Sequence, residues 1–193
     1  MTARGTDATI DLSPLVAVER APAADSAAIE AEVLALFDDF RDPLLRYVCA
    51  FGISISDGED LIQDVFLALY RHLSQNGARS NLQGWLFRVA HNLALKRRAR
   101  IRREHRRIDS GLHAAHSVLD PRHDPEAQLS DSQRRTRLMA VLNALPERDR
   151  HCVHLRGHGL RYREIARVLG MSLGAVAKSL TRSIARLHRA DKG

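Results

Sequence analysis

The stretch that decides the fold is residues 162–181, which read YREIARVLGMSLGAVAKSLT. Ala166 is small enough for two helices to cross closely there, and Gly170 can adopt the left-handed backbone of a tight interhelical turn. Ser172 is placed to cap a second helix, in which Val176 faces inward. This spacing predicts a helix-turn-helix. A helical hairpin without a DNA-binding role has the same pattern and stays open as an alternative.

The charge distribution favours a DNA-binding role for this motif. Residues 133–193 carry fourteen basic and four acidic side chains, and residues 96–107 carry eight basic and one acidic. Residues 108–132, between these segments, carry one arginine and five acidic side chains. Two positive segments separated by an acidic one indicate two contacts with a polyanion such as DNA. Solvated helix faces are the alternative interpretation.

In a helix-turn-helix, the second helix enters the major groove with its N-terminal half. Arginine and lysine can pair with guanine acceptors, and small side chains can contact thymine methyl groups, whereas other arginines bind phosphate. The side chains expected to contact DNA from this motif are Arg161, Arg163, Ser172, Ala175, Lys178, Ser179, Arg182 and Arg186.

Apolar residues at helical spacing predict helices in the N-terminal half as well. Ser26 is placed to cap a first helix. Pro43 is expected to open a second helix, which Gly52 ends. A third helix is expected to begin at Ser56, with Glu59 completing a capping box.

A loop and a long basic helix follow. Residues 74–81 contain Asn, Gly and Ser and predict a loop. Residues 82–107 predict a helix with an apolar first half and an almost wholly basic second half. Trp85 is spaced for a place in the core, and stacking on a nucleic-acid base is the alternative.

The expected fold class is all-α, with two small helical domains at residues 26–108 and 133–193. Residues 1–25 are interpreted as a mobile tail, and residues 109–132, with their prolines and acids, as a flexible linker. No run approaches 18 consecutive apolar residues, and no basic segment followed by an apolar one opens the chain. Neither a membrane span nor a secretion signal is therefore expected.

The cysteines and histidines do not indicate a cofactor. Cys49 and Cys152 stand alone in apolar contexts, so a reducing cytoplasm is expected and both residues are placed in the core. His151, His154 and His158 have a spacing that could bind zinc, but two glycines interrupt the helix at the third. Surface or phosphate-facing positions are favoured for them, and no metal or cofactor is expected.

Four segments together resemble the sigma-70 family of bacterial RNA polymerase sigma factors. DGEDLIQDVFLALY (residues 57–70) resembles the family's polymerase-docking helix, and WLFRVAHNLAL (residues 85–95), with the basic residues after it, resembles its −10 promoter helix. LNALPERDR (residues 142–150) and residues 162–172 resemble its −35-binding domain. Their order and the short chain resemble the extracytoplasmic-function group, which keeps only region 2 and region 4.

The resemblance implies the sites. The N-terminal domain would bind the clamp coiled coil of the polymerase through Asp60, Gln63, Asp64 and Phe66, and the C-terminal domain would bind −35 duplex and the polymerase flap. The loop at residues 75–81 would capture a flipped base of the −10 element. The residues expected to contact −10 DNA are Asn76, Arg79, Ser80, Arg88, His91, Asn92, Lys96, Arg97, Arg98 and Arg100.

The implied protein is not an enzyme but a subunit that directs core RNA polymerase to promoters and helps to open the −10 region. The resemblance also implies an inhibitory anti-sigma partner, no membrane contact of its own, and a monomer outside the holoenzyme. The first alternative is a stand-alone helix-turn-helix regulator that binds a palindrome by itself. The second is a small recombinase, which needs a catalytic Ser or Tyr among arginines or an acidic metal triad.

Overall fold

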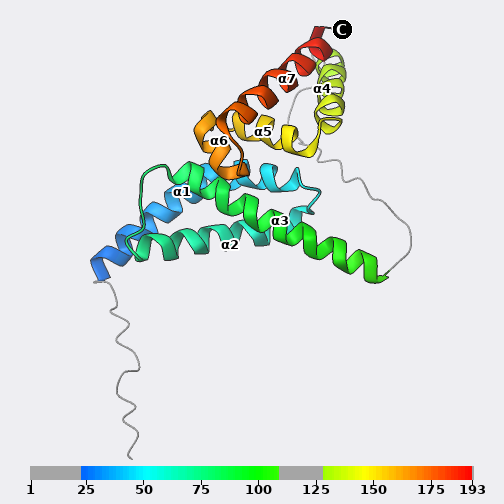
Figure 1. Cartoon of the computed structure of the whole chain (residues 1–193). Coiled ribbons are helices and arrows are strands. Elements are labelled where there is room, and N and C mark those ends of the chain that lie inside the picture. Colours follow the sequence, from blue (N-terminus) through cyan, green and yellow to red (C-terminus); the bar gives the residue numbers. More distant parts are fainter. Residues whose placement is uncertain (1–22, 109–127, 193) are drawn as a thin grey trace, which may run out of the picture.

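The computed structural model describes residues 23–108 and 128–192, in which every regular element is a helix (Figure 1). The N-terminal helices are α1 (Ala23–Cys49), α2 (Ile55–Ser74) and α3 (Leu82–Ile108), and the C-terminal helices are α4 (Gln128–Asn143), α5 (Glu147–Gly157), α6 (Tyr162–Leu169) and α7 (Leu173–Lys192). The expected all-α class is confirmed for these residues. Most of the predicted tail and most of the predicted linker lie outside the described residues, while α1 begins inside the predicted tail and α4 inside the predicted linker.

Helix α1 runs without a break through Pro43, whereas the sequence predicted two helices and a cap at Ser26. Both predictions are wrong, because α1 begins before Ser26 and contains Pro43. Pro43 removes the hydrogen bond to the carbonyl of residue 39 and crowds that carbonyl, but Asp39 lies on the exposed side of the helix, where water can reach it. Leu44 and Tyr47, just after the proline, are fully buried, and their packing continues the helix.

The N-cap of α2 is Ser54, not Ser56 as predicted. The Ser54 hydroxyl accepts a hydrogen bond from the backbone N–H of Asp57 at 3.1 Å. Glu59, the expected partner in a capping box, instead forms a 3.0 Å ion pair with Arg41 of α1. The prediction failed because two serines in close succession both fit the capping pattern, and the packing of the helix selects the first.

The helix-turn-helix is confirmed in its turn and in its second cap. Gly170 follows α6 with φ at 61°, in the left-handed region that favours glycine. The Ser172 hydroxyl accepts a hydrogen bond from the backbone N–H of Ala175 at 3.2 Å, which caps α7. Ile165 of α6 and Val176 of α7 are fully buried, so the two helices share an apolar contact on their inner sides.

The C-terminal helices pack on the N-terminal ones, with α5 and α6 lying over α1 and α3 (Figure 1). The rings of Phe51 and His151 stack with centroids 4.1 Å apart. The Gln83 side-chain amide donates to the backbone carbonyl of His158 at 2.8 Å. The buried side chains of both groups form one continuous hydrophobic cluster, so the described structure is a closed arrangement of two helical groups.

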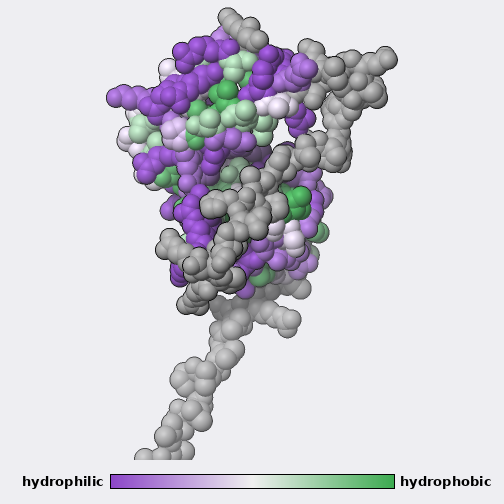
Figure 2. Space-filling model, turned by 90° about the vertical axis from the view of Figure 1, so that its right-hand side faces the viewer, coloured by the Kyte–Doolittle hydropathy of each residue, from purple (hydrophilic) through white to green (hydrophobic). Residues whose placement is uncertain are grey.

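The surface of the described helices is mainly hydrophilic. Figure 2 shows hydrophilic residues over both groups, with hydrophobic residues in small separate areas. Large exposed hydrophobic side chains include Leu67 of α2 and Met139 of α4, which lie on different groups. No helix among the described residues is long and apolar enough to cross a membrane.

Candidate nucleic-acid and docking surfaces

The outer side of α7 carries an exposed row of residues suited to DNA. Ala175, Lys178, Arg182 and Arg186 are all exposed and recur every three or four positions, which places them on one side of the helix. The row combines a small side chain near the helix N-terminus with three cations. This is the arrangement that can meet base edges first and phosphates further along.

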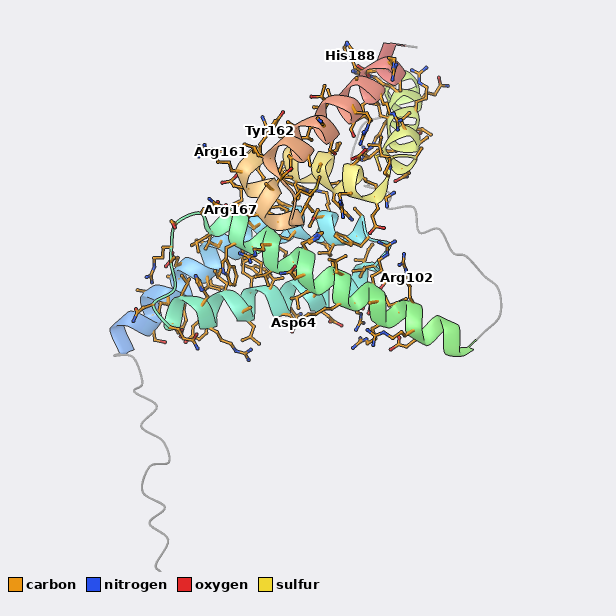
Figure 3. All side chains as sticks on the ribbon, in the orientation of Figure 1. Asp64, Arg102, Arg161, Tyr162, Arg167 and His188 are labelled. Carbon is orange, nitrogen blue, oxygen red and sulfur yellow. The ribbon has the colours of Figure 1, made fainter. Side chains whose placement is uncertain are left out.

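Three further predicted residues lie at the starts of α6 and α7. Arg161 and Arg163 are exposed at the beginning of α6, and Arg161 lies on the outer end of the C-terminal group in Figure 3. Ser172 is exposed, but its hydroxyl is already engaged as the cap of α7. The exposed backbone and side chains at these two helix starts are placed to contact phosphate, since helix N-termini favour anions.

Ser179 does not belong to this surface, and its prediction as a DNA contact does not fit the structure. Its side chain is 2% exposed, and its hydroxyl donates to Asp149 Oδ1 at 2.8 Å. Arg182 donates to the other carboxylate oxygen of Asp149 at 2.7 Å, while 56% of its side chain stays exposed. Ser179 faces inward because it lies three residues after Val176, on the same buried side of α7.

Asp149 of α5 positions part of the α7 row, and its sequence context did not reveal this contact. It is 5% exposed and holds Arg182 and Ser179 together. Burial alone raises the pKa of Asp149, but the hydrogen bonds from Arg182 and Ser179 outweigh burial, so the pKa lies below its usual value. The signal in the sequence was an acid three residues before Cys152, on the apolar side of a short helix.

Helix α3 carries a second exposed polar row. Arg88, Asn92, Lys96 and Arg100 are exposed and spaced four residues apart, so they form a stripe along one side of the helix. Arg102 is also exposed, in the part of α3 that extends beyond the other helices in Figure 3, and it lies on a different side of the helix because it follows Arg100 by two residues. A cationic stripe of this length suits the backbone of a nucleic acid.

The other three predicted residues of α3 face protein instead of solvent. His91 is 7% exposed, and its Nδ1 lies 2.9 Å from the Tyr47 hydroxyl. Arg97 binds Asp57 at the start of α2, and this hydrogen bond holds the pKa of the Asp57 carboxyl below its usual value. Arg98 binds Glu147 of α5. In the closed arrangement, therefore, His91, Arg97 and Arg98 are not placed to contact DNA.

The loop between α2 and α3 presents its predicted residues to solvent. Asn76, Arg79 and Ser80 are exposed. Asn76 has φ at 55°, a left-handed conformation that asparagine tolerates better than most residues. Arg79 forms a 3.1 Å ion pair with Glu32 of α1. The loop therefore offers three polar side chains from a backbone that is tied to the helices beside it.

The predicted docking residues divide into an exposed set and one buried residue. Asp60, Gln63 and Asp64 are exposed on α2, and Asp64 lies on the side away from the C-terminal helices in Figure 3. Phe66 is 5% exposed, and its ring packs edge-on against a phenylalanine of α1, so it is a core residue and its assignment to the docking surface does not fit the structure. Leu67 is 48% exposed. It follows Asp64 by three residues, Gln63 by four and Asp60 by seven, so it lies on the same side of the helix as these polar residues.

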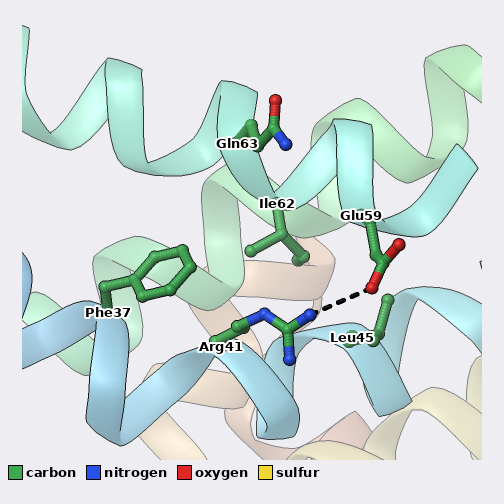
Figure 4. Close-up of a pocket in the computed structure, with 6 residues that line it drawn as sticks. All are labelled: Phe37, Arg41, Leu45, Glu59, Ile62 and Gln63. Atoms are coloured by element: carbon green, nitrogen blue, oxygen red, sulfur yellow. Dashed lines mark hydrogen bonds and ion pairs between the residues drawn. The ribbon is translucent and has the colours of Figure 1, made fainter. Parts of the chain in front are cut away.

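A small pocket borders this face of α2 (Figure 4). It lies between α1 and α2, and its lining residues are Phe37, Arg41, Leu45, Glu59, Ile62 and Gln63. The ion pair between Arg41 and Glu59 crosses it. Gln63 belongs both to the pocket and to the exposed polar set, so the pocket and the docking face are continuous.

The three histidines of α5 and its C-cap are buried to different extents, and the expectation of surface positions is wrong for His151, whereas His154 and His158 are half-buried. His151 is 3% exposed, lies 5.6 Å from His91 between ring centroids, and has its pKa lowered to about 4, mainly by burial. Burial likewise lowers the pKa of His154 to about 4. His158 packs against Phe87 of α3. His151 is buried because α5 packs on the N-terminal helices, a contact that periodicity within α5 cannot reveal.

The described residues contain no group of three or more His, Cys, Asp or Glu side chains arranged to hold a metal ion. Cys49 and Cys152 are both buried free thiols, as predicted, and burial raises the pKa of each. The polar chemistry of the described chain is therefore concentrated in the basic rows of α3 and α7, the loop between α2 and α3, and the acidic face of α2.

Comparisons with known proteins identify both halves of the chain. The model of sigma-70 region 2 matches residues 36–107, and that of sigma-70, region 4 matches residues 135–187. The ECF RNA polymerase sigma factor SigE of Mycolicibacterium smegmatis is 37% identical over 136 residues, which cover 68% of this chain and 51% of SigE. This chain thus aligns with about half the length of that relative.

Two solved structures share the fold. The sigma factor RpoE in complex with the anti-sigma factor NepR from Bartonella quintana matches with a TM-score of 0.62 and 21% identity, over 86% of this chain and 97% of that one. CnrH in complex with the cytosolic domain of CnrY matches with a TM-score of 0.56 and 22% identity, over 86% and 92% of the two chains.

Proposed function

Because the chain belongs to the sigma-70 family of RNA polymerase sigma factors, in the extracytoplasmic-function group, we propose that it binds core RNA polymerase, directs it to promoters and helps to open the −10 region. The observation that carries this proposal is the presence of two separate exposed cationic rows, on α3 and α7, in a chain that also exposes an acidic face on α2. One row serves each promoter element, and the acidic face serves the polymerase.

The α7 row is proposed to bind the −35 duplex. Lys178 and Arg182 have the length to reach base edges in the major groove from a helix N-terminal half, and Ala175 can contact a thymine methyl group. Arg186 and the arginines at the start of α6 are assigned to phosphate. Asp149 orients one member of this row, because its carboxylate accepts a hydrogen bond from the Arg182 side chain.

The α3 row and the loop before it are proposed to hold the −10 element. The stripe from Arg88 to Arg100 would follow the backbone of the separating strands, and the loop residues Asn76, Arg79 and Ser80 would surround a base that has left the stack. His91, Arg97 and Arg98 could join this surface only if their present protein contacts open.

The exposed face of α2 is proposed to dock on the clamp coiled coil of the polymerase. Asp60, Gln63 and Asp64 supply acidic and amide groups, and Leu67 supplies the apolar contact that the sequence analysis assigned to Phe66. An interface that combines one desolvated apolar side chain with a polar rim is the usual anatomy of a protein contact. The C-terminal domain is assigned to the flap.

An anti-sigma factor is proposed as a second protein partner. Support comes from two similar folds, CnrH and the sigma factor RpoE, whose structures contain the cytosolic domain of CnrY and the anti-sigma factor NepR, respectively. The proposed site of action is the cytoplasm, where polymerase is found, and the chain is proposed to act as a subunit without catalysis of its own.

A selection from fragmented genomic DNA separates this function from a stand-alone regulator. The purified chain is mixed with the fragments in the presence and in the absence of bacterial core RNA polymerase, and the bound fragments are sequenced. A promoter-directing subunit is expected to retain discrete fragments only together with the polymerase. Retention of palindromic fragments by the chain alone, unchanged when polymerase is added, would favour the regulator instead.

A further inference from the structure

The loop between α2 and α3 is held in shape by a side chain that the proposed mechanism does not use. We propose that His72 is a positioning residue, which fixes residues 75–81 in the conformation that receives an unpaired −10 base. This inference rests on the proposed function, because it assigns the loop to −10 DNA. It identifies the residue that determines the conformation of the loop and therefore which base the loop accepts.

The imidazole of His72 is enclosed by the loop on one side and by α3 on the other. Its ring stacks on Trp85 with centroids 4.8 Å apart and an interplanar angle of 26°. Its Nε2 lies 3.1 Å from the backbone carbonyl oxygen of Ala78. In the tautomer that carries the proton on Nε2, the ring donates this hydrogen bond and so connects the middle of the loop to α2.

The absence of a side chain at Gly77 leaves room for the His72 ring. A Cβ atom at residue 77 would lie 2.3 Å from Cε1, 2.4 Å from Nδ1 and 2.5 Å from Nε2 of the His72 ring. The ring of His72 therefore occupies the space that any other residue at position 77 would need. Because a side-chain ring can rotate away more easily than the backbone can shift, an alanine at this position is expected to displace the ring and leave the loop ends in place.

The two ends of the loop are fixed independently of the His72 side chain. At the end of α2, the backbone N–H of Gly77 donates to the carbonyl of His72 at 2.8 Å, and Asn76 adopts its left-handed conformation. At the start of α3, the Asn81 side chain accepts from the backbone N–H of Gly84 at 3.1 Å. Ala78 lies between these two anchors, and the hydrogen bond from the His72 ring fixes its carbonyl.

The stack also decides the role of Trp85. One face of its ring is covered by His72, and the residue is half-buried against the core. Trp85 therefore supports the His72 ring, and the face of Trp85 that His72 covers is not available to stack on a DNA base. The side chains that remain for the base are the exposed polar ones of the loop, Asn76, Arg79 and Ser80.

The test uses four variants of the full chain, each assembled with core polymerase. His72→Ala removes both the stack and the hydrogen bond, and Gly77→Ala displaces the ring without altering it. His72→Phe keeps the stack alone and is the conservative variant. Ser74→Ala, at an exposed position in the last turn of α2, is the matched control. Melting temperatures of the free chains show whether each variant is folded.

The readout is permanganate reactivity of unpaired thymines at a −10 element, measured on promoters in which each −10 position is randomised. His72→Ala and Gly77→Ala are expected to lower opening about tenfold, the effect of roughly one lost hydrogen bond in a confined site. Both are also expected to broaden the preference for the captured base, with partial rescue in His72→Phe, while −35 footprints and polymerase binding stay at the wild-type level.

Two outcomes separate this inference from the proposed function. If the wild-type holoenzyme opens promoters, and folded His72→Ala and Gly77→Ala open them with the same yield and the same base preference, His72 has no positioning role, although the sigma function stands. If the wild-type chain gives no opening with core polymerase, the proposed function itself fails, and the positioning role fails with it.

Discussion

Asp149 is the single residue on which the geometry of the proposed −35 surface depends most. Its two carboxylate oxygens receive hydrogen bonds from Ser179 and Arg182, at 2.8 and 2.7 Å, although the carboxylate is nearly buried. A buried acid with paired donors is stable, whereas removing it leaves the donors without partners. Asp149 is expected to contact no DNA itself, and it acts through the direction that it gives to Arg182.

Asp149→Ala should lower the free energy of unfolding by about 1–3 kcal/mol, because it leaves the buried Ser179 hydroxyl without its acceptor. Urea denaturation followed by circular dichroism measures the loss. Asp191→Ala removes an ion pair with Arg134 at the surface and serves as the control, with a smaller expected loss of stability because solvent screens exposed ion pairs. Equal effects of the two substitutions would contradict a structural role for the Asp149 contacts.

The same contact predicts a pH dependence. The pKa of Asp149 lies below its usual value in the folded chain, so its contribution to stability is present above its unfolded pKa of about 3.9 and is lost as the pH falls further. The stability difference between wild type and Asp149→Asn is therefore expected to shrink below about pH 4. A difference that stays constant from pH 7 to pH 3 would show that ionisation of Asp149 has no part in the effect.

At the scale of single helices, α7 has two sides with different roles. Its buried side packs within the domain, and its exposed side is available to DNA. Val176, Ser179 and Leu180 face inward, while Lys178 and Arg186 face solvent. Arg182 belongs to both sides because it is bound to Asp149. Lys178 and Arg186 are therefore the better pair for testing DNA contact without disturbing the fold.

Lys178→Ala with Arg186→Ala should weaken holoenzyme binding to −35 DNA, because it removes one contact to a base edge and one to phosphate. The slope of log affinity against log salt should fall by about one, for the phosphate that Arg186 neutralises. Filter binding over a salt series measures both quantities. Affinity for core polymerase is expected to stay unchanged. An unaltered salt slope would remove this side of α7 from the DNA interface.

Helix α2 is organised in the same way, with a buried apolar side and an exposed docking side. Asp64→Lys with Leu67→Ser should weaken binding to core polymerase at least about tenfold, since it reverses a charge and removes the apolar contact of the face. Fluorescence anisotropy of the labelled chain titrated with core polymerase gives the affinity. Asp38→Lys, at an exposed acid of α1, is the matched charge reversal and is expected to have little effect.

The sequence predicts a helix correctly where local residue preferences determine it, and fails where packing against other helices determines it. A helix that contains residues 57–70 and a turn at Gly170 follow from local periodicity and backbone preference, and both are present in the structure. The break at Pro43 and the cap at Ser56 were wrong because packing against other helices overrides a local signal. The inward positions of Ser179, His91 and Phe66 depend on which other helix packs against each of them. The residue pattern within a single helix does not reveal these tertiary contacts.

At the scale of the whole molecule, the two helical groups are packed together. The promoter elements named −35 and −10 lie roughly 25 base pairs apart, or roughly 85 Å at about 3.4 Å per base pair. A ring stack such as that of Phe51 on His151, at 4.1 Å, cannot persist while each group binds its own element. We therefore expect the groups to separate on the polymerase, which also uncovers His91 and Arg98.

Acid should loosen the closed arrangement. Burial lowers the pKa of His91 and of His151, the latter to about 4, so the neutral rings stabilise the contact above their ordinary pKa near 6.5 and this stabilisation is lost as the pH falls toward 4. The groups facing them are Tyr47, Glu147 and the arginines Arg98 and Arg150. Glu147 partly offsets the effect because it favours protonated histidine.

Small-angle X-ray scattering at pH 7.5 and pH 5 measures this opening as an increase in the radius of gyration. His151→Phe keeps a ring against Phe51 but cannot be protonated, so it should reduce the increase. His188→Phe, at an exposed histidine of α7, should leave it as in the wild type. The interpretation fails if His151→Phe expands on acidification as much as the wild type does.

The claim that one chain directs polymerase through two DNA surfaces can be examined by transcription in vitro. Bacterial core RNA polymerase is supplied with the purified chain and the selected genomic fragments, and start sites are mapped by primer extension. Discrete starts are expected that depend on the chain, share upstream −35 and −10 elements, and disappear with Lys178→Ala and Arg186→Ala. A stoichiometric complex of chain and polymerase that gives no start site beyond those of core polymerase alone would contradict the claim.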